Sequence, residues 1–208
     1  MPIKFNWQQT YAWERAHSNS AEILASDPHS SQVYDVLEAT DVHEDGQFQI
    51  WLSLARDGSI YSMNQAAHCY EIGRGIALDL AEAERWYAEA SARGSEIAMI
   101  RCAHQMAGRG DYESCVEILQ RGVDSAWAPA LFWQSWYRLE QCEDAKTNRM
   151  VRPMLQAASD AGHPGADWYL ARLMARGVFG PENKAAGRQR IMEISSEIVK
   201  EIERSAEA

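Results

Sequence analysis

The sequence predicts an all-α solenoid of antiparallel helix pairs, closed by helical caps at both ends. Three observations predict it: segments with helical periodicity end on glycine, the helices that follow recur at similar intervals, and glycine-rich turns separate the helices. Helical segments end at Gly58, Gly94 and Gly162. The helices of the repeat start near positions 62, 98, 130 and 166, at intervals of 36, 32 and 36 residues. Repeats of this length built from two helices stack into a solenoid.

The best-defined helix spans residues 81–94, where Ala, Trp and Tyr recur at helical spacing. Asp79 stands before this segment and Glu82 follows three residues later, which is the spacing of a capping box. Arg93 and Gly94 close the segment with a cation in the last turn and a glycine just beyond it. Both features are typical of helix C-termini, so the boundaries of this helix are predicted at both ends.

Glycines also occur in the segments between the two helices of a repeat. Such positions suit tight turns with positive φ, which glycine adopts without steric cost. These turn glycines are Gly73, Gly75, Gly108, Gly110, Gly177 and Gly180.

The N-terminal region, residues 1–46, predicts a helical cap that hides one apolar face of the stack. Residues 5–24 have helical periodicity, with an interruption near residues 18–20. Asp27-Pro28 is a helix-start signal. Asp41 and Glu44 have capping-box spacing. They open a helix with apolar residues at Phe48, Trp51, Leu52 and Ala55.

Residues 185–208 predict a long amphipathic helix that ends the solenoid. Isoleucine recurs every three or four residues, at Ile191, Ile194, Ile198 and Ile202. This stripe either packs back on the last repeat or forms a dimer seam. We expect a cap over residues 1–46, repeats over 47–195, and the end of the capping helix over 196–208.

The first repeat carries a specific resemblance. Its residues are Ala66-Ala67, Tyr70, Gly73, Gly75, Ile76, Asp79, Ala83, Trp86-Tyr87, Ala90-Ser91 and Gly94. This pattern resembles the Sel-one-like repeat family, a relative of the tetratricopeptide repeat. The resemblance implies a right-handed superhelix and assigns Trp86 and Trp168 to positions that pack between helices.

The other repeats match this pattern less completely. The second keeps Gly108, Gly110 and Asp111, with Cys102 and Cys115 in core positions of the repeat. The third is diverged on its first helix, and Pro153 interrupts its second helix, which predicts a late start or a kink there. The fourth matches on its first helix. The resemblance covers roughly residues 47–195.

Composition restricts the classes of partner. The net charge is −10, which disfavours binding to nucleic acids or anionic membranes, because both need cationic residues. Residues 1–58 hold nine acidic and three basic residues, a net charge of −6. This acidity is explained either by solubility or by a basic partner.

The sequence predicts a cytoplasmic chain without cofactor or metal. No stretch approaches the roughly 20 apolar residues of a membrane helix. The four cysteines lack the paired spacing of a zinc site, and free, mostly buried thiols in a reducing compartment explain them. Their positions in the repeat favour structural burial over nucleophilic roles.

Repeat register predicts a binding surface. If the small residue near the start of each first helix is position one, then positions four and seven lie on one stripe, facing away from the stack. In solenoids related to tetratricopeptide repeats this stripe lines the concave groove. It contains Trp, Tyr and Arg, which are common at binding hot spots. Its members are Gln65, His68, Arg101, His104, Trp133, Trp136, Tyr169 and Arg172.

Two arrangements of this stripe are open. The residues either line a groove for a partner, or are exposed polar groups with the aromatic members tucked under the N-terminal region. Residues 1–46 either cap the stack or occupy the groove, which would make the protein self-inhibited. Neighbouring helices lie roughly 10 Å apart, which places His68 and His104 too far apart to share a metal.

We expect a non-enzymatic scaffold or adaptor that holds a protein or peptide in the groove, as a monomer or weak dimer. An alternative is an inhibitory binding protein of the immunity type, motivated by the acidic N-terminal region. A further alternative is a hydrolase using the groove histidines, which requires His68 or His104 beside a carboxylate or thiol in a pocket. No catalytic motif supports it, so no catalytic residue is expected.

Overall fold

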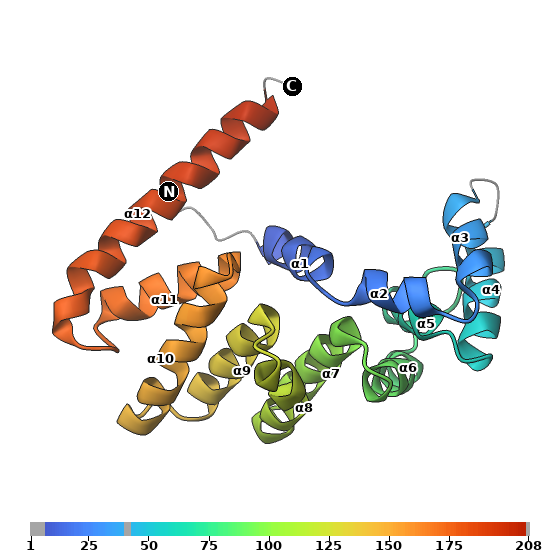
Figure 1. Ribbon diagram of the computed structural model, residues 1–208, viewed down its shortest axis with the longest axis horizontal. Helices are drawn as coiled ribbons and strands as arrows, with labels where there is room; N and C mark the ends of the chain where they lie inside the picture. The colour runs from blue at the N-terminus through green and yellow to red at the C-terminus, as the bar shows by residue number, and fades with distance from the viewer. Residues whose placement is uncertain (1–6, 40–42, 207–208) are drawn as a thin grey trace. The chain divides into compact units, whose positions relative to one another are not determined.

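The computed structural model describes residues 7–39 and 43–206, and within these ranges it is built from helices without any strand (Figure 1). The helices recur with the predicted spacing. Their bounds are α1 Trp7–Ala16, α2 Ser20–Ser26, α3 Ser30–Glu38, α4 Glu44–Arg56, α5 Ile60–Ile72, α6 Leu80–Ala92, α7 Glu96–Gly108, α8 Tyr112–Asp124, α9 Ala128–Gln141, α10 Ala145–Asp160, α11 Pro164–Arg176, the 3-10 helix η1 Pro181–Asn183 and α12 Lys184–Ala206.

The chain forms two compact units, which we describe separately. Unit 1 comprises Met1–Glu14 and Gln120–Ala208, and unit 2 comprises Arg15–Leu119. Four first helices, α5, α7, α9 and α11, begin close to the predicted positions. Each is followed by a second helix, so the chain has the all-α architecture of stacked helix pairs that the sequence predicts.

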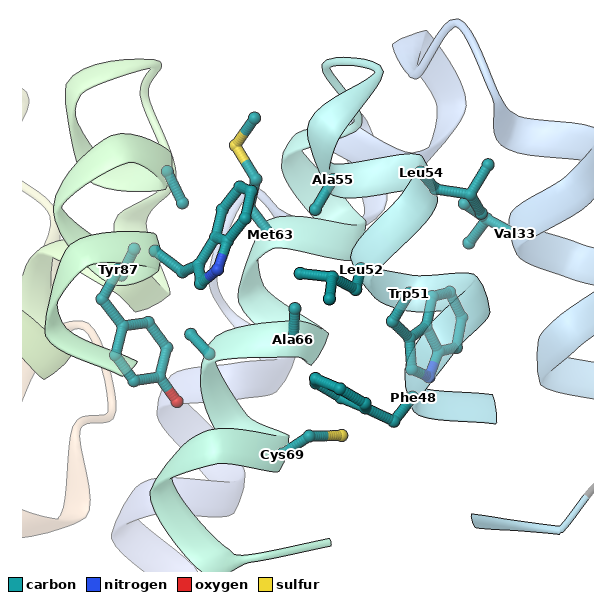
Figure 2. Packing of buried hydrophobic residues seen from close by; sticks show 14 of the residues in the cluster. Val33, Phe48, Trp51, Leu52, Leu54, Ala55, Met63, Ala66, Cys69 and Tyr87 are labelled. Atoms are coloured by element: carbon teal, nitrogen blue, oxygen red, sulfur yellow. The ribbon is translucent and has the colours of Figure 1, made fainter. Parts of the chain in front are cut away.

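The core of unit 2 lies between α3, α4, α5, α6 and α7 (Figure 2). Phe48 and Leu52 of α4 are buried against the small residue Ala66 of α5, as the periodicity of α4 predicts. Leu54 of α4 and Val33 of α3 belong to the same buried cluster, both labelled in Figure 2. The α4 helix thus packs on α5.

Both ends of α6 follow the predicted chemistry. Asp79 caps α6, because its carboxylate accepts hydrogen bonds from the backbone N–H groups of Ala81 and Glu82, both at 3.0 Å. Gly94 follows α6 with φ +104°, a conformation that favours glycine. Gly108 differs from the other predicted turn glycines, because it is the last residue of α7 and has no positive φ.

The C-terminal helix α12 packs on α11, as one of the two predicted arrangements requires. Ile194 is buried there, while Ile191 and Ile198 are half-buried. Gly187 makes the approach close, since a Cβ atom at this position would meet the Ala171 carbonyl oxygen at 2.6 Å. The side chain of Ile202 lies outside the described residues.

Several local predictions need correction. Pro153 lies inside α10, so the late start predicted for this helix is wrong: the helix begins eight residues earlier, at Ala145. The capping box at α6 is incomplete, because the Glu82 carboxylate pairs with Arg85 instead of the backbone N–H of Asp79. Cys142 follows the end of α9 and is exposed, unlike the other three cysteines.

The N-terminal helices depart from the prediction in detail. The expected interruption of the first helix is present, since α1 ends at Ala16 and α2 begins at Ser20. His29, not Asp27, precedes the first residue of α3. Phe5 and Asp41, which were expected to begin helices, lie outside the described residues. In the described ranges no helix has the length and apolar character needed to cross a membrane.

Candidate functional site

The predicted stripe is half-exposed in unit 2. Gln65 and His68 lie on α5, and Arg101 and His104 lie on α7. Gln65, His68 and Arg101 each keep part of their surface accessible, and the Arg101 side chain is 41% exposed. Unit 2 therefore presents hydrogen-bonding and cationic groups from two successive first helices.

Glu71, which the sequence did not single out, organises this part of the stripe. Its carboxylate accepts a hydrogen bond from the Tyr87 hydroxyl at 3.1 Å and lies 3.3 Å from Nδ1 of His68. Arg101 places a guanidinium nitrogen 3.7 Å from the other carboxylate oxygen. Burial disfavours ionisation of Glu71, but the hydrogen bonds and the Arg101 charge outweigh it and hold its pKa below the usual value.

His104 has a different environment from His68. Burial disfavours its charged form, and the neighbouring Arg101 cation adds to this effect. Together they lower the pKa of His104 to about 4, although Glu71 acts in the opposite direction. His104 is consequently neutral at neutral pH, whereas the cation of this cluster is Arg101.

The stripe in unit 1 is aromatic. Trp133 and Trp136 lie on α9, and Tyr169 and Arg172 lie on α11. Trp136 stacks on Tyr169 with ring centroids 4.5 Å apart, which joins the two helices. Arg172 is exposed and lies over the ring of Trp168, 5.1 Å from its centroid.

Helix α1 covers part of this aromatic stripe. Trp7 stacks on Trp133 at 6.0 Å and meets Trp136 edge-on at 5.6 Å. It also meets Trp168 edge-on at 6.1 Å, and Tyr11 stacks on Trp133 at 6.4 Å. Trp133 is only 6% exposed as a result, and Tyr169 is buried as well. Within unit 1, residues 7–14 therefore occupy part of the surface that the sequence assigned to a partner.

A buried carboxylate fixes α1 in place. Glu14 Oε1 accepts a hydrogen bond from Nε1 of Trp133 at 2.7 Å and lies 3.1 Å from Nε2 of His163. Nδ1 of His163 accepts the backbone N–H of Ala166 at 3.0 Å, as the N-cap of α11. Because Nδ1 is an acceptor, the proton of the neutral imidazole lies on Nε2, which donates to Glu14.

In unit 2 the N-terminal segment is held at the starts of first helices. Asn19 donates from its side-chain amide to the Gly94 carbonyl at 2.8 Å and accepts from the Glu96 N–H at 3.2 Å, beside the start of α7. Asp27 accepts from the Ser59 hydroxyl at 2.8 Å, and Ser59 is the N-cap of α5. Polar groups at helix starts thus anchor α2 without aromatic contacts of the kind seen in unit 1.

The site geometry meets one requirement of the hydrolase alternative, since His68 lies beside Glu71. The neighbouring thiols do not suit nucleophilic catalysis. Burial raises the pKa of Cys69 and raises that of Cys102 to about 12, so the reactive thiolate is disfavoured in both. Across residues 7–39 and 43–206, no group of three or more His, Cys, Asp or Glu side chains could hold a metal ion.

The residues that anchor α1 were not predicted from the sequence. Glu14 and His163 are 149 positions apart, and their contact follows from no local motif. One signal was present: Trp7, Tyr11 and Glu14 recur at the i, i+4, i+7 spacing of one helix face. A carboxylate on an aromatic helix face indicates a buried polar partner, because an unpaired buried charge is costly.

Comparison with known proteins gives matches in structure only. No protein-family model and no curated protein matches this sequence. A Sel1 repeat protein from Oxalobacter formigenes is similar with a TM-score of 0.62 and 16% identity, over 73% of this chain and 63% of that chain. A protective antigen of uropathogenic Escherichia coli with an SLR fold matches with a TM-score of 0.62 and 19% identity, over 73% of this chain and 34% of that one.

The chain thus spans less than two thirds of the length of both solved structures. The likeness agrees with the helix pairs of the described residues. In the first repeat, Trp86 and Tyr87 are both buried. The chain has the fold of these Sel1-repeat proteins, an α-helical solenoid of helix pairs.

Proposed function

We propose that this protein is a non-enzymatic scaffold that holds a protein or peptide partner on the stripe of its first helices. The observation that carries the proposal is the half-exposed polar cluster of unit 2. There, Glu71 and Tyr87 orient His68 and Arg101 without using up their accessible surface. Side chains held in place by neighbours lose less entropy on binding, which favours recognition.

The unit 1 part of the stripe contributes differently to this proposal. Trp136 and Arg172 keep accessible surface, so a partner can contact them directly. Trp133 is buried under α1 and would serve a partner only after α1 moves. Tyr169 is buried beside Trp136. We place this scaffold in the cytoplasm, because its three buried cysteines are free thiols, which a reducing compartment preserves.

The test is co-purification from the native cells at low and moderate salt. The His68→Ala/Arg101→Ala double variant is compared with Arg85→Ala, a control on α6 that also removes an ion-paired, exposed arginine. We expect a specific protein to be retained by the wild type and the control, and lost by the double variant with unchanged helicity.

The same measurement separates the alternatives. Equal retention by the double variant and the control would overturn the assignment of the unit 2 cluster. Retention that falls steeply with salt would favour a basic partner of the inhibitory type, since charge would then dominate association. Trp136→Ala extends the test to unit 1: weakened binding with intact helicity supports a contact there, and loss of the fold shows a core role.

A further inference from the structure

Residues 7–14 of helix α1 contact the rest of unit 1 in the manner of a bound peptide. Trp7, Thr10, Tyr11 and Glu14 follow one another at positions i, i+3, i+4 and i+7. This spacing presents one face of a helix and is the usual pattern of anchors when an amphipathic helix lies in a groove. Thr10 and Glu14 are fully or almost fully buried, and Trp7 is half-buried.

Each anchor meets a distinct part of the surface on α9 and α11. Trp7 lies among the rings of Trp133, Trp136 and Trp168. Thr10 lies over Gly165, where an added Cβ atom would meet its methyl group at 3.2 Å. Glu14 receives the N–H groups of Trp133 and His163. The seat of α1, defined by these contacts, therefore selects a large aromatic, a small side chain and a carboxylate.

One anchor fits this seat incompletely. The Thr10 hydroxyl is buried and has no hydrogen-bond partner among residues 7–39 and 43–206, while its methyl group packs over Gly165. A buried hydroxyl without a partner has lost its hydration without compensation. A helix with valine at this position would fill nearly the same volume without that loss. In addition, α1 has only ten residues, and helices this short are marginal in isolation.

We propose that the seat of α1 is a receptor for an amphipathic helix of a partner protein, and that α1 is its internal competitor. The partner helix carries an aromatic residue, a β-branched apolar residue three positions later and an acidic residue four positions after that. This inference rests on the proposed function, because it names the class of partner for the unit 1 part of the stripe. Displacement of α1 exposes Trp133 to that partner.

The first experiment compares peptides on the full-length protein by fluorescence anisotropy. The probe is a labelled peptide of residues 7–18, with the natural sequence or with Thr10→Val. We expect the Val peptide to bind about tenfold more tightly, because it lacks the unpaired hydroxyl. A Trp7→Ala peptide should lose binding, and its failure to do so would show that the peptide binds elsewhere.

The second experiment removes the competitor. Thr10→Asp in the full chain places a charge in the buried contact between α1 and Gly165. Because this charge is disfavoured there, α1 should leave its seat, while the sequences of α9 and α11 are unaltered. The Val peptide should then bind about tenfold more tightly than it binds the wild type. Equal affinities, with far-ultraviolet circular dichroism showing a folded chain, would overturn the role of α1 as competitor.

A double-mutant cycle tests the carboxylate subsite in the Thr10→Asp chain, where α1 no longer competes. Trp133→Phe removes the N–H donor and retains an aromatic ring. It should weaken a Glu14-containing peptide about tenfold and a Glu14→Gln peptide much less, because only the former makes the charge-assisted bond. Equal losses for both peptides would contradict the assigned subsite.

Two outcomes separate this inference from the proposed function. If no peptide binds but His68→Ala/Arg101→Ala still releases the native partner, the inference fails and the scaffold stands. If the peptides bind as expected but the native cells yield no retained protein, the receptor stands and the proposed use of the unit 2 cluster fails. Two copies of the wild-type protein could instead exchange α1 and form a dimer, which size-exclusion chromatography would detect and the peptide would dissociate. That result would overturn the proposal that the seat binds a helix of a separate partner.

Discussion

Each unit holds a carboxylate between an aromatic hydrogen-bond donor and an imidazole, but the two carboxylates serve different ends. Glu14 lies between Trp133 and His163 in unit 1, and its side chain is 3% exposed. Glu71 lies between Tyr87 and His68 in unit 2, and its side chain is 23% exposed.

The origin of each carboxylate explains this difference. Glu71 belongs to the first helix of a repeat and keeps its neighbours Arg101 and His68 near the solvent. Glu14 belongs to α1, whose aromatic residues Trp7 and Tyr11 stack on Trp133 and cover it. The comparison teaches that similar polar chemistry gives a solvent-exposed cluster or a buried anchor, depending on what covers it.

The largest expected effect is the loss of the Trp133 ring. Trp133→Ala should lower the free energy of unfolding by about 3–5 kcal/mol, because it empties a buried site and removes a partner of Glu14. Arg101→Ala in unit 2 should cost less than about 1 kcal/mol, as half-exposed ion pairs contribute little. Urea unfolding followed by circular dichroism measures both, and similar costs would contradict the contrast between the units.

A pH dependence sharpens the description of unit 2. The pKa of His104 is lowered to about 4 by burial and by Arg101. Above about pH 6.5 the histidine is neutral in both states and its contribution to stability is complete. Between about pH 6.5 and 4 the unfolded chain takes up a proton and the folded chain does not, so stability falls, by at most about 3 kcal/mol. His104→Gln should flatten this part of the stability profile; an unchanged slope would contradict burial of a neutral imidazole.

A matched pair of amides compares the carboxylates directly. Glu14→Gln should cost about 1–3 kcal/mol, because it weakens charge-assisted bonds to Trp133 and His163 in a buried site. Glu71→Gln should cost less than about 1 kcal/mol, since its surroundings are partly solvated. Thermal unfolding of the two variants gives the comparison, and the reverse order would show that exposure does not govern the two sites.

The smallest effect concerns salt. The pairing of Glu71 with Arg101 is partly exposed, so raising the ionic strength should reduce its small contribution further. The Glu14 interactions are buried and should change much less. Measuring the Glu71→Gln and Glu14→Gln penalties at about 0.05 M and 1 M salt tests this, and a larger salt response at Glu14 would argue that water reaches it.

Local chemistry made the repeats predictable from the sequence. Asp79, Gly94 and the buried pair Trp86-Tyr87 each act within a few residues of their own helix, so their pattern indicates both boundaries and core. The stripe was also placed on the correct helices, α5, α7, α9 and α11.

The sequence left the covering of Trp133 open: aromatic members tucked under the N-terminal region were one of two arrangements, and Trp7 and Tyr11 do stack on this ring. No sequence pattern chose between the two arrangements. Glu14, the partner of Trp133, lies 119 positions away, and repeat register describes only what a helix presents, not what later covers it. Cys142 shows the same limit on a smaller scale, because its exposure follows from where α9 ends. Pro153 shows that a residue unfavourable to helices can lie inside one, here α10, which packs on α9 and α11.

The two hydrogen bonds of His163 also make it a natural spectroscopic probe. The ring has one proton and one lone pair, and Glu14 uses the first while the Ala166 amide uses the second. Nitrogen chemical shifts should therefore report a single Nε2–H tautomer while α1 is seated. The exchange rate of that ring proton with solvent would then report how often the helix leaves, in the intact chain and without any added label.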